Sequence, residues 1–250
     1  MEELSLLVDL HKHQQRQGPG SEEVTARAVE LAGLRGAGAL RIVDIGCGTG
    51  AASLQLAKMQ DASITAVDLL PDFIEVLRDN AAREGLSGSI KALVGSMDKL
   101  PFADGEFDVV WSEGAVYNIG FAEGVRQWRR LLRPGGILLV SEISWLSLER
   151  PGAVQRYWDA AYPEIATQAE KTEQLENSGY EVIDTFTLPE ACWMENYYLP
   201  LLESFDDFLA RHPGDSQAAA LVEAEKTEIE LYRQYSDFYS YCMYIARVRR

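Results

Sequence analysis

Short apolar segments alternate with helical segments through the first 142 residues, and this alternation most constrains the fold. The apolar segments are five or six residues long and occupy residues 40–45, 64–68, 90–94, 107–111 and 136–140. Helical patterns occupy residues 51–59, 72–84 and 122–132. Strands that are apolar throughout and alternate with helices form a parallel sheet covered on both faces. The sequence therefore predicts a doubly wound α/β fold.

Helical segments also precede and follow this core. Residues 4–15 and a segment from Ser21 to residue 34 have helical patterns, and Gly18-Pro19-Gly20 separates them. Ser21 is a favourable N-cap for the second segment. Beyond the core we predict helices at 154–162 and 171–178 and a strand at 180–188. We therefore divide the chain into N-terminal helices (1–36), a core (37–145) and a third part (146–250).

The third part contains a long insertion, residues 189–237, which is rich in aromatic and acidic residues. We expect two helices in it, with a break near His212-Pro213-Gly214. Residues 239–248 alternate between apolar and polar positions and are expected to form the last strand. A turn back onto the strand at 180–188 would make this last strand antiparallel. The third part thus combines helical lid insertions with the closing strands of the same sheet.

The formal net charge of −16 limits the kinds of partner that the chain can bind. A surface of this sign on average repels DNA, RNA and anionic membranes. The arginines that could form a basic patch lie near the end of a predicted helix, where cations complement the helix dipole; they are Arg126, Arg129, Arg130 and Arg133. We therefore expect neither a nucleic-acid partner nor a membrane partner, and a monomer or homodimer.

Cysteine usage and the N-terminal sequence indicate the compartment. Cys47, Cys192 and Cys242 are far apart and show no CxxC spacing, which argues against a disulfide framework and against a zinc site. The N-terminal residues lack the basic start and apolar core of a signal peptide. No apolar run approaches the roughly 20 residues that a membrane-spanning helix needs. We expect a cytoplasmic protein without a metal site.

The most informative stretch is residues 43–50, VDIGCGTG, which follow the first strand and open a helix. Glycines at this place let the backbone turn sharply and approach a ligand closely. The spacing GxGxG differs from the GxGxxG of dinucleotide enzymes, and no P-loop lysine follows. Asp44 lies just before the turn, where it can accept backbone hydrogen bonds or orient a water near a cationic ligand. A structural turn without a ligand is the alternative.

Asp68 ends the second strand, about 20 residues beyond the turn, where an acidic residue can accept both hydroxyls of a ribose. The alternative role for Asp68 is a cap of the helix that follows. Because this acid and the glycine turn occur together, we favour ribose binding.

At this point the sequence resembles the class I S-adenosylmethionine-dependent methyltransferases. Four segments carry the resemblance, in the order found in that family: VDIGCGTG, AVDLLP, GSMDKLPF and LLRPGGILLVSE. They cover residues 40–142, and the subgroup is similar to the UbiE-like small-molecule enzymes. The resemblance implies a Rossmann-like sheet of seven strands in the order 3-2-1-4-5-7-6, with strand 7 antiparallel. It also implies S-adenosyl-L-methionine as the cofactor and a small-molecule methyl acceptor.

The resemblance further implies which residues contact the cofactor. Gly46, Cys47, Gly48 and Gly50, with Asp44, would form the turn beside its methionine and ribose parts. Asp68 would bind the ribose hydroxyls, and Leu69 would lie beside the adenine. Ser96 replaces the acid that many relatives carry in GDAxxLPF, so the adenine contact falls to Ser96, Met97 or Asp98.

The fourth strand ends in Ser112-Glu113-Gly114, a position that faces the methyl group in the family. Glu113 is therefore a candidate for contact with the cofactor amino group or with the substrate, and a buried acid paired with an arginine is the alternative. Glu113 and Tyr117 are the catalytic candidates. Tyr117, Asn118 and Trp145 are the candidate substrate contacts. His11, His13 and His212 lie outside the motifs and are expected at the surface.

The insertion is expected to act as a lid over the acceptor. Its aromatic residues could enclose a flat or cationic molecule, or could simply pack on the sheet. Its acids Glu190, Glu195, Glu203, Asp206 and Asp207 would disfavour an anionic acceptor, or could form the solvated faces of two helices. Three alternatives to a small-molecule methyltransferase stay open: a nicotinamide oxidoreductase, a non-catalytic cofactor-binding module, and a protein methyltransferase.

Overall fold

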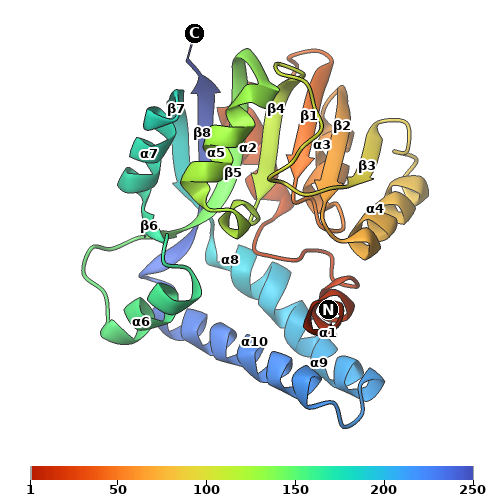
Figure 1. Cartoon of the computed structure of the whole chain (residues 1–250), viewed down its shortest axis with the longest axis vertical. Helices are drawn as coiled ribbons and strands as arrows, with labels where there is room; N and C mark the ends of the chain where they lie inside the picture. The colour runs from red at the N-terminus through yellow and green to blue at the C-terminus, as the bar shows by residue number, and fades with distance from the viewer. Residues whose placement is uncertain (1, 250) are drawn as a thin grey trace.

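The computed structural model describes residues 2–249, and within them eight strands form one sheet (Figure 1). The strands are β1 (Leu40–Ile45), β2 (Ala62–Asp68), β3 (Ile90–Val94), β4 (Phe107–Glu113), β5 (Leu132–Trp145), β6 (Ala166–Thr167), β7 (Tyr180–Thr187) and β8 (Tyr239–Val248). The order along the sheet is β3-β2-β1-β4-β5-β8-β7, and β6 pairs with β5 outside this path. β8 is antiparallel to both of its neighbours, whereas β1 to β5 pair in parallel. The predicted order is confirmed, and the two-residue β6 is an addition that shifts the numbering of the last two strands.

Helices cover both faces of the sheet and its carboxyl-terminal edge. They are α1 (Glu2–His11), α2 (Glu22–Leu31), α3 (Ala51–Met59), α4 (Pro71–Arg83), α5 (Phe121–Trp128), α6 (Gly152–Ala161), α7 (Gln168–Asn177), α8 (Glu190–Trp193), α9 (Leu199–Arg211) and α10 (Ser216–Tyr235). A π-helical turn, Met194–Tyr198, joins α8 to α9. Figure 1 shows α1, α6, α9 and α10 gathered below the sheet as a separate layer. Within the described residues, no helix combines the length and the apolar character that crossing a membrane requires.

Successive side chains along each strand point to opposite faces of the sheet, so they contribute alternately to two apolar clusters, one on each face. Ile42 and Leu139 contribute to the cluster that includes α2, α3 and α4, whereas their neighbours Val43 and Val140 contribute to the cluster with α5 and α7. All four side chains are fully buried. This double burial explains why the strands are apolar at consecutive positions, as the sequence predicted.

The break in the insertion and the capping of α2 are confirmed. Ser21 accepts a hydrogen bond from the Val24 N–H at 3.1 Å, as expected of an N-cap. Between α9 and α10 the chain turns at residues 212–215, and Asp215 caps α10 by accepting from the N–H groups of Gln217 and Ala218.

Several predicted bounds are wrong, and the largest differences lie at the ends of α1, α5 and β5. α1 ends at His11 rather than at residue 15. α5 ends at Trp128, followed by a short 3-10 turn, Arg129–Leu131. β5 runs from Leu132 to Trp145, well beyond the predicted 136–140, because β8 pairs with it as far as Trp145 and Tyr239. Because β8 lies about 100 residues later in the sequence, its pairing with β5 cannot be predicted from the residues around β5.

A buried ion pair lies where β5 was expected to have ended. Glu142 in β5 and Lys171 in α7 have fully buried side chains, and the Lys171 Nζ lies 3.5 Å from the Glu142 Oε1. Nζ also donates to the Glu164 carbonyl oxygen at 2.9 Å and lies over the Phe121 ring. Burial raises the pKa of Glu142 to about 7 even though Lys171 lowers it, and burial lowers the pKa of Lys171. Each group is therefore tolerated in the core only because of the other.

Replacing Lys171 should leave an unpaired acid in the core. We expect Lys171→Met to lower the free energy of unfolding by about 3–5 kcal/mol near pH 8. Loss of the ammonium raises the pKa of Glu142 further, so the folded variant takes up a proton and the loss should shrink as the pH falls toward 5. Urea unfolding at several pH values would measure it. Lys226→Met, in the exposed pair with Glu223 on α10, is the control and should change stability by less than about 0.5 kcal/mol. A similar, pH-independent loss in both variants would contradict this account.

Candidate active site

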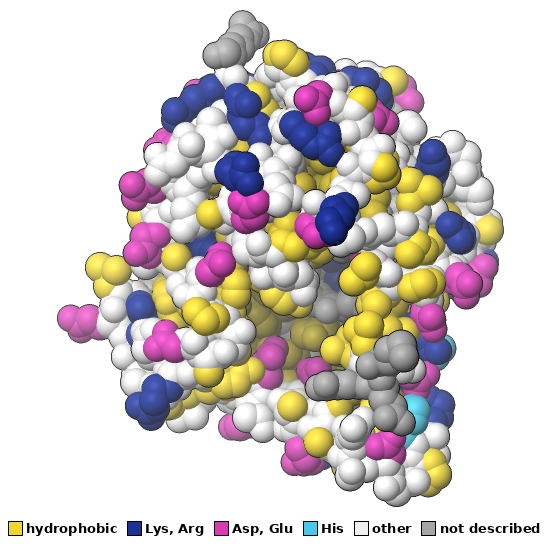
Figure 2. Space-filling model, in the orientation of Figure 1, with side chains coloured by type: hydrophobic (Ala, Val, Ile, Leu, Met, Phe, Trp, Pro, Cys, Tyr) yellow, Lys and Arg dark blue, Asp and Glu magenta, His cyan; other side chains and the backbone are white. Residues whose placement is uncertain are grey.

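A cavity of about 810 Å³ lies between the carboxyl-terminal edge of the sheet and the helical layer. Figure 2 shows the molecule hollowed between these two halves, with hydrophobic side chains around the opening. Its walls come from β1, β2 and β4, the segments that follow them, the N-terminal segment, α6, α8 and α10. Carboxyl ends of adjacent parallel strands are the usual place for a ligand in such a sheet.

The glycine turn after β1 forms one wall of the cavity. Gly46, Cys47 and Gly48 line it, and the two glycines have φ values of +74° and +54°. Side chains at these positions would be strained, and a Cβ would collide with Ala115 at Gly46 or with Gln17 at Gly48. The turn therefore offers bare backbone to the cavity.

Gly50 has a different role from the one predicted. It is not among the described residues that line the cavity, and a Cβ on it would collide with Leu77 of α4. Gly50 is the N-cap of α3 and has a φ of +94°, a conformation that favours glycine. Because it has no side chain, α4 can pack closely against the turn. The prediction that Gly50 contacts a ligand is wrong for this arrangement.

Two carboxylates lie next to the turn, Asp44, which is buried, and Asp68, which is half-buried. The Asp44 Oδ2 accepts a hydrogen bond from the Ser53 hydroxyl at 2.6 Å, and burial raises the pKa of Asp44 to about 7. The Asp68 Oδ2 accepts from the Gly48 N–H and its Oδ1 from the Leu70 N–H, both at 2.9 Å. Burial also raises the pKa of Asp68. Both acids line the cavity, and Asp68 is held in place by the glycine turn itself.

The segment after β3 supplies the rim. Ser96, Met97 and Asp98 line the cavity, as does Leu69, whose side chain is 60% exposed. The Ser96 hydroxyl donates to the exposed Asp98 carboxylate, and this hydrogen bond lowers the pKa of Asp98. The Trp128 Nε1 donates to the Met97 carbonyl at 3.0 Å, which fixes the segment. The serine and the acid two residues later thus form one polar unit.

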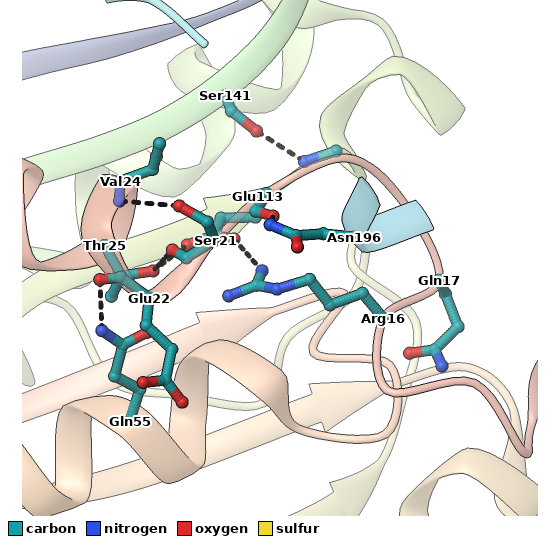
Figure 3. A network of polar contacts seen from close by, with 12 residues as sticks. Arg16, Gln17, Ser21, Glu22, Val24, Thr25, Gln55, Glu113, Ser141 and Asn196 are labelled. Carbon is teal, nitrogen blue, oxygen red and sulfur yellow. Dashed lines mark hydrogen bonds and ion pairs between the residues drawn. The ribbon is translucent and has the colours of Figure 1, made fainter. Parts of the chain in front are cut away.

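Glu113, at the end of β4, anchors the N-terminal segment (Figure 3). Its Oε2 accepts from the Arg16 Nη1 at 3.0 Å, and its Oε1 accepts from the Thr25 hydroxyl and the Trp111 Nε1 at 3.1 and 3.0 Å. Arg16 and Glu113 have side chains only 12% exposed. Because both carboxylate oxygens already accept hydrogen bonds, the arginine-paired acid that the sequence left as an alternative is the arrangement found.

Gln17 lies across the glycine turn. Its Oε1 accepts from the Thr49 N–H and hydroxyl at 2.9 and 3.1 Å, and its Nε2 donates to the carbonyls of His11 and Gln14. The sequence analysis missed Arg16 and Gln17, although both belong to a short run of polar residues before a Gly-Pro-Gly turn.

The remaining walls are largely aromatic. Tyr117 and Asn118 line the cavity as predicted, and the Asn118 Nδ2 donates to the Ala115 carbonyl at 2.9 Å. Trp145 is not among the lining residues described: it is buried, packs edge-on against Tyr239, and carries the Arg150 guanidinium over its ring. The prediction of Trp145 as a substrate contact is wrong because β5 continues to this residue and buries it.

The expectation that His11 lies at the surface is also wrong. It lines the cavity and is 5% exposed, rather than lying at the surface. It stacks on Tyr197, and its Nε2 lies 3.5 Å from the Glu225 Oε1. The reason is that α1 packs on α9 and α10, which turns its last residue inward.

The acids that were predicted to disfavour an anionic acceptor at the mouth of the cavity lie instead on the exposed surface of the insertion. Glu190, Glu195, Glu203, Asp206 and Asp207 are all exposed, and none is among the described lining residues. They form the solvated faces of α8 and α9 and the turn between these helices, which was the alternative for them. The acids of the insertion that line the cavity are Glu225 and Glu228 of α10.

Comparison with known proteins points to one family. Residues 42–136 match the family model described as a methyltransferase domain. The ubiquinone/menaquinone biosynthesis C-methyltransferase UbiE of Azotobacter vinelandii is 31% identical over 141 residues, which cover 55% of each chain. The O-methyltransferase cnsE of Penicillium expansum is 28% identical over 60% of this chain and 55% of its own. The chain thus spans about half the length of these curated relatives.

Solved structures share the whole fold. An S-adenosylmethionine-dependent methyltransferase from Geobacter sulfurreducens, in complex with S-adenosyl-L-homocysteine, has a TM-score of 0.84 at 18% identity and covers 100% of this chain and 98% of its own. The [4+2]-cyclase SpnF has a TM-score of 0.76 at 22% identity and covers 98% of this chain and 93% of its own. At these identities the likeness concerns the fold alone.

The anchor at Glu113 can be tested without a ligand. We expect Glu113→Gln to speed amide hydrogen exchange across residues 12–20 on the order of tenfold, because a hydrogen bond to a charged group contributes about 1.5–3 kcal/mol. Mass spectrometry of peptic fragments would measure the exchange. Glu123→Gln is the control, since Glu123 and Arg126 form an exposed pair on α5. Equal exchange of this segment in both variants would show that the Arg16 pair does not anchor it.

Proposed function

We propose that this chain is a class I S-adenosylmethionine-dependent methyltransferase, because residues 42–136 match a methyltransferase domain, and that it transfers the methyl group of S-adenosyl-L-methionine to a small molecule and releases S-adenosyl-L-homocysteine. One observation carries the proposal. The Asp68 carboxylate is fixed by the N–H of Gly48, so an acid and a bare glycine turn share one cavity wall at the carboxyl ends of β1 and β2.

The residues of this wall fit the cofactor chemically. Asp68 has lone pairs beyond those used by the two backbone N–H groups, and a carboxylate of this kind accepts ribose hydroxyls. Gly46 and Gly48 line the cavity without side chains, and Leu69 offers an apolar side chain for the adenine. Ser96 and Asp98 are the polar groups available to the adenine amino group. Asp44, buried behind the turn, supports the wall.

The bound cofactor would supply a methyl group already activated by a sulfonium, so the main tasks of the protein are to align the acceptor and exclude water. Arg16 and Gln17 hold the N-terminal segment over the cavity and exclude solvent from that side. Tyr117 is 43% exposed and lines the cavity, so its hydroxyl is available to orient an acceptor. Glu113 acts in this proposal through Arg16 rather than as a base.

The shape of the cavity supports a small acceptor. About 810 Å³ exceeds what one cofactor molecule needs and leaves a compartment between the aromatic residues of α6 and α8 and the acids of α10. The covering segments leave little room for the surface of a folded protein, which disfavours a protein acceptor. The GxGxG spacing disfavours a nicotinamide cofactor, and labelled transfer to a metabolite extract would exclude a non-catalytic module.

Replacing Asp68 should weaken cofactor binding. We expect Asp68→Ala to lower the affinity for S-adenosyl-L-methionine on the order of ten- to a hundredfold, because a hydrogen bond to a charged group contributes about 1.5–3 kcal/mol. Isothermal titration calorimetry would measure it, with circular dichroism to confirm folding. Asp79→Ala on the exposed side of α4 is the control and should bind normally. An unchanged affinity in Asp68→Ala would remove this residue from the site.

A further inference from the structure

The wall that α10 contributes to the cavity carries two carboxylates, Glu225 and Glu228. Glu228 accepts a hydrogen bond from the Tyr198 hydroxyl at 2.9 Å on one oxygen and from the Tyr157 hydroxyl at 3.2 Å on the other. Both partners are neutral, and burial raises the pKa of Glu228. Glu225 lies one turn earlier, and its side chain is 15% exposed.

No fixed cation balances this pair in the part of the chain that the structure describes. Arg16 is the one arginine or lysine among the described lining residues, and Glu113 already binds it. His11 is the basic side chain that approaches Glu225, at 3.5 Å. Its Nδ1 is buried without a hydrogen-bond partner, which marks a polar position in this wall that the protein itself does not satisfy. Carboxylates in such surroundings are stable when a cation joins them.

The surrounding side chains have the faces that a cation prefers. Tyr157 and Trp158 of α6 pack edge-on with ring centroids 5.3 Å apart, and both line the cavity. Trp193 and Tyr241 line it too, but Trp193 stacks on both Tyr232 and Tyr241, at 4.5 and 5.3 Å, so it serves as an apolar wall rather than as a cation contact. Electron-rich ring faces attract ammonium groups, above all where water is excluded. Acids and ring faces thus meet in one compartment.

We propose that this compartment binds a small organic ammonium ion, with Glu225 and Glu228 as its counter-ions and the aromatic residues as its walls, so that the methyl acceptor is an amine. The inference rests on the proposed function, because the compartment opens into the same cavity as the glycine turn. A neutral acceptor would leave the two acids uncompensated, and a carboxylate or phosphate would meet like charge.

The charge of the ligand also fits the reaction. A bound ammonium has no free lone pair, so its proton must first pass to one of the two carboxylates. The nitrogen lone pair then forms the N–C bond while the C–S bond breaks and leaves its electron pair on sulfur. The product is again a cation, and the carboxylate returns its proton to water. Glu225 and Glu228 therefore act on the acceptor, whereas Asp68 acts on the cofactor.

A pair of isosteric probes tests the charge requirement directly. Choline and 3,3-dimethylbutan-1-ol have nearly the same shape, but only choline is charged. With saturating S-adenosyl-L-homocysteine, we expect calorimetry on the wild-type chain to show at least about tenfold tighter binding of choline. Glu225→Gln and Glu228→Gln should each reduce that preference. The controls are Glu223→Gln and Glu230→Gln, two acids of α10 whose side chains are 72% exposed, and they should keep it.

Each outcome separates the two proposals. Equal affinity for the two probes, no binding of choline, or an unchanged preference in both Glu225→Gln and Glu228→Gln would overturn the amine assignment. The wild-type comparison decides the matter even if Glu228→Gln fails to fold without its full pair of tyrosine partners. Failure of S-adenosyl-L-homocysteine to bind the wild-type chain would instead contradict the proposed function. Normal binding of that molecule without a choline preference would leave the methyltransferase proposal standing and reject only the amine.

Discussion

The ion pair between Glu113 and Arg16 is the contact on which the site depends. It joins the end of a central strand to a segment almost 100 residues away in the sequence. Glu113 also accepts from Thr25 at the start of α2, so the acid fixes both sides of the Gly-Pro-Gly turn. Asn196 adds a third tie by donating to the Gly20 carbonyl at 2.9 Å. With these contacts in place, His11 and Gln17 become walls of the cavity.

The two halves of the cavity are built by different means. The glycine turn and Asp68 belong to the first βαβ unit, and their positions follow from strand ends and backbone hydrogen bonds. The aromatic half is assembled from α6, α8 and α10, which approach one another only in the folded chain. Trp193 shows this, since it stacks on Tyr232 of α10 and on Tyr241 of β8. Substitutions in the aromatic half can therefore alter which acceptor binds without altering the sheet or the glycine turn.

Sequence patterns predict whatever depends on neighbours along the chain. The strands themselves, the turn at Gly46 and Gly48 and the carboxylate at Asp68 were predicted because periodicity, turn chemistry and motif spacing are local. The strand order was predicted only from the resemblance to a known family. His11 was misplaced because its burial depends on the packing of α1 against α9 and α10, which lie near the other end of the chain. The end of β5 was misplaced for the same reason: Glu142 is polar, and only Lys171 makes it acceptable in a buried strand. At Gly50 a glycine is required, as expected, but the reason is its close packing against Leu77 rather than contact with a ligand.

The place of β8 in the sheet has a consequence for the order in which the chain folds. Among the described residues 2–249, β7 pairs only with β8, which comes about 50 residues later and lies between β7 and β5. Until β8 is in place, β5 and β7 each present an unpaired edge, and such edges pair readily with other chains. The segment that contains α8, α9 and α10 must therefore loop back on the sheet for β8 to pair with β5 and β7. Because Tyr241 of β8 also stacks on Trp193 of α8, the strand that completes the sheet is the one that supplies a wall of the aromatic compartment.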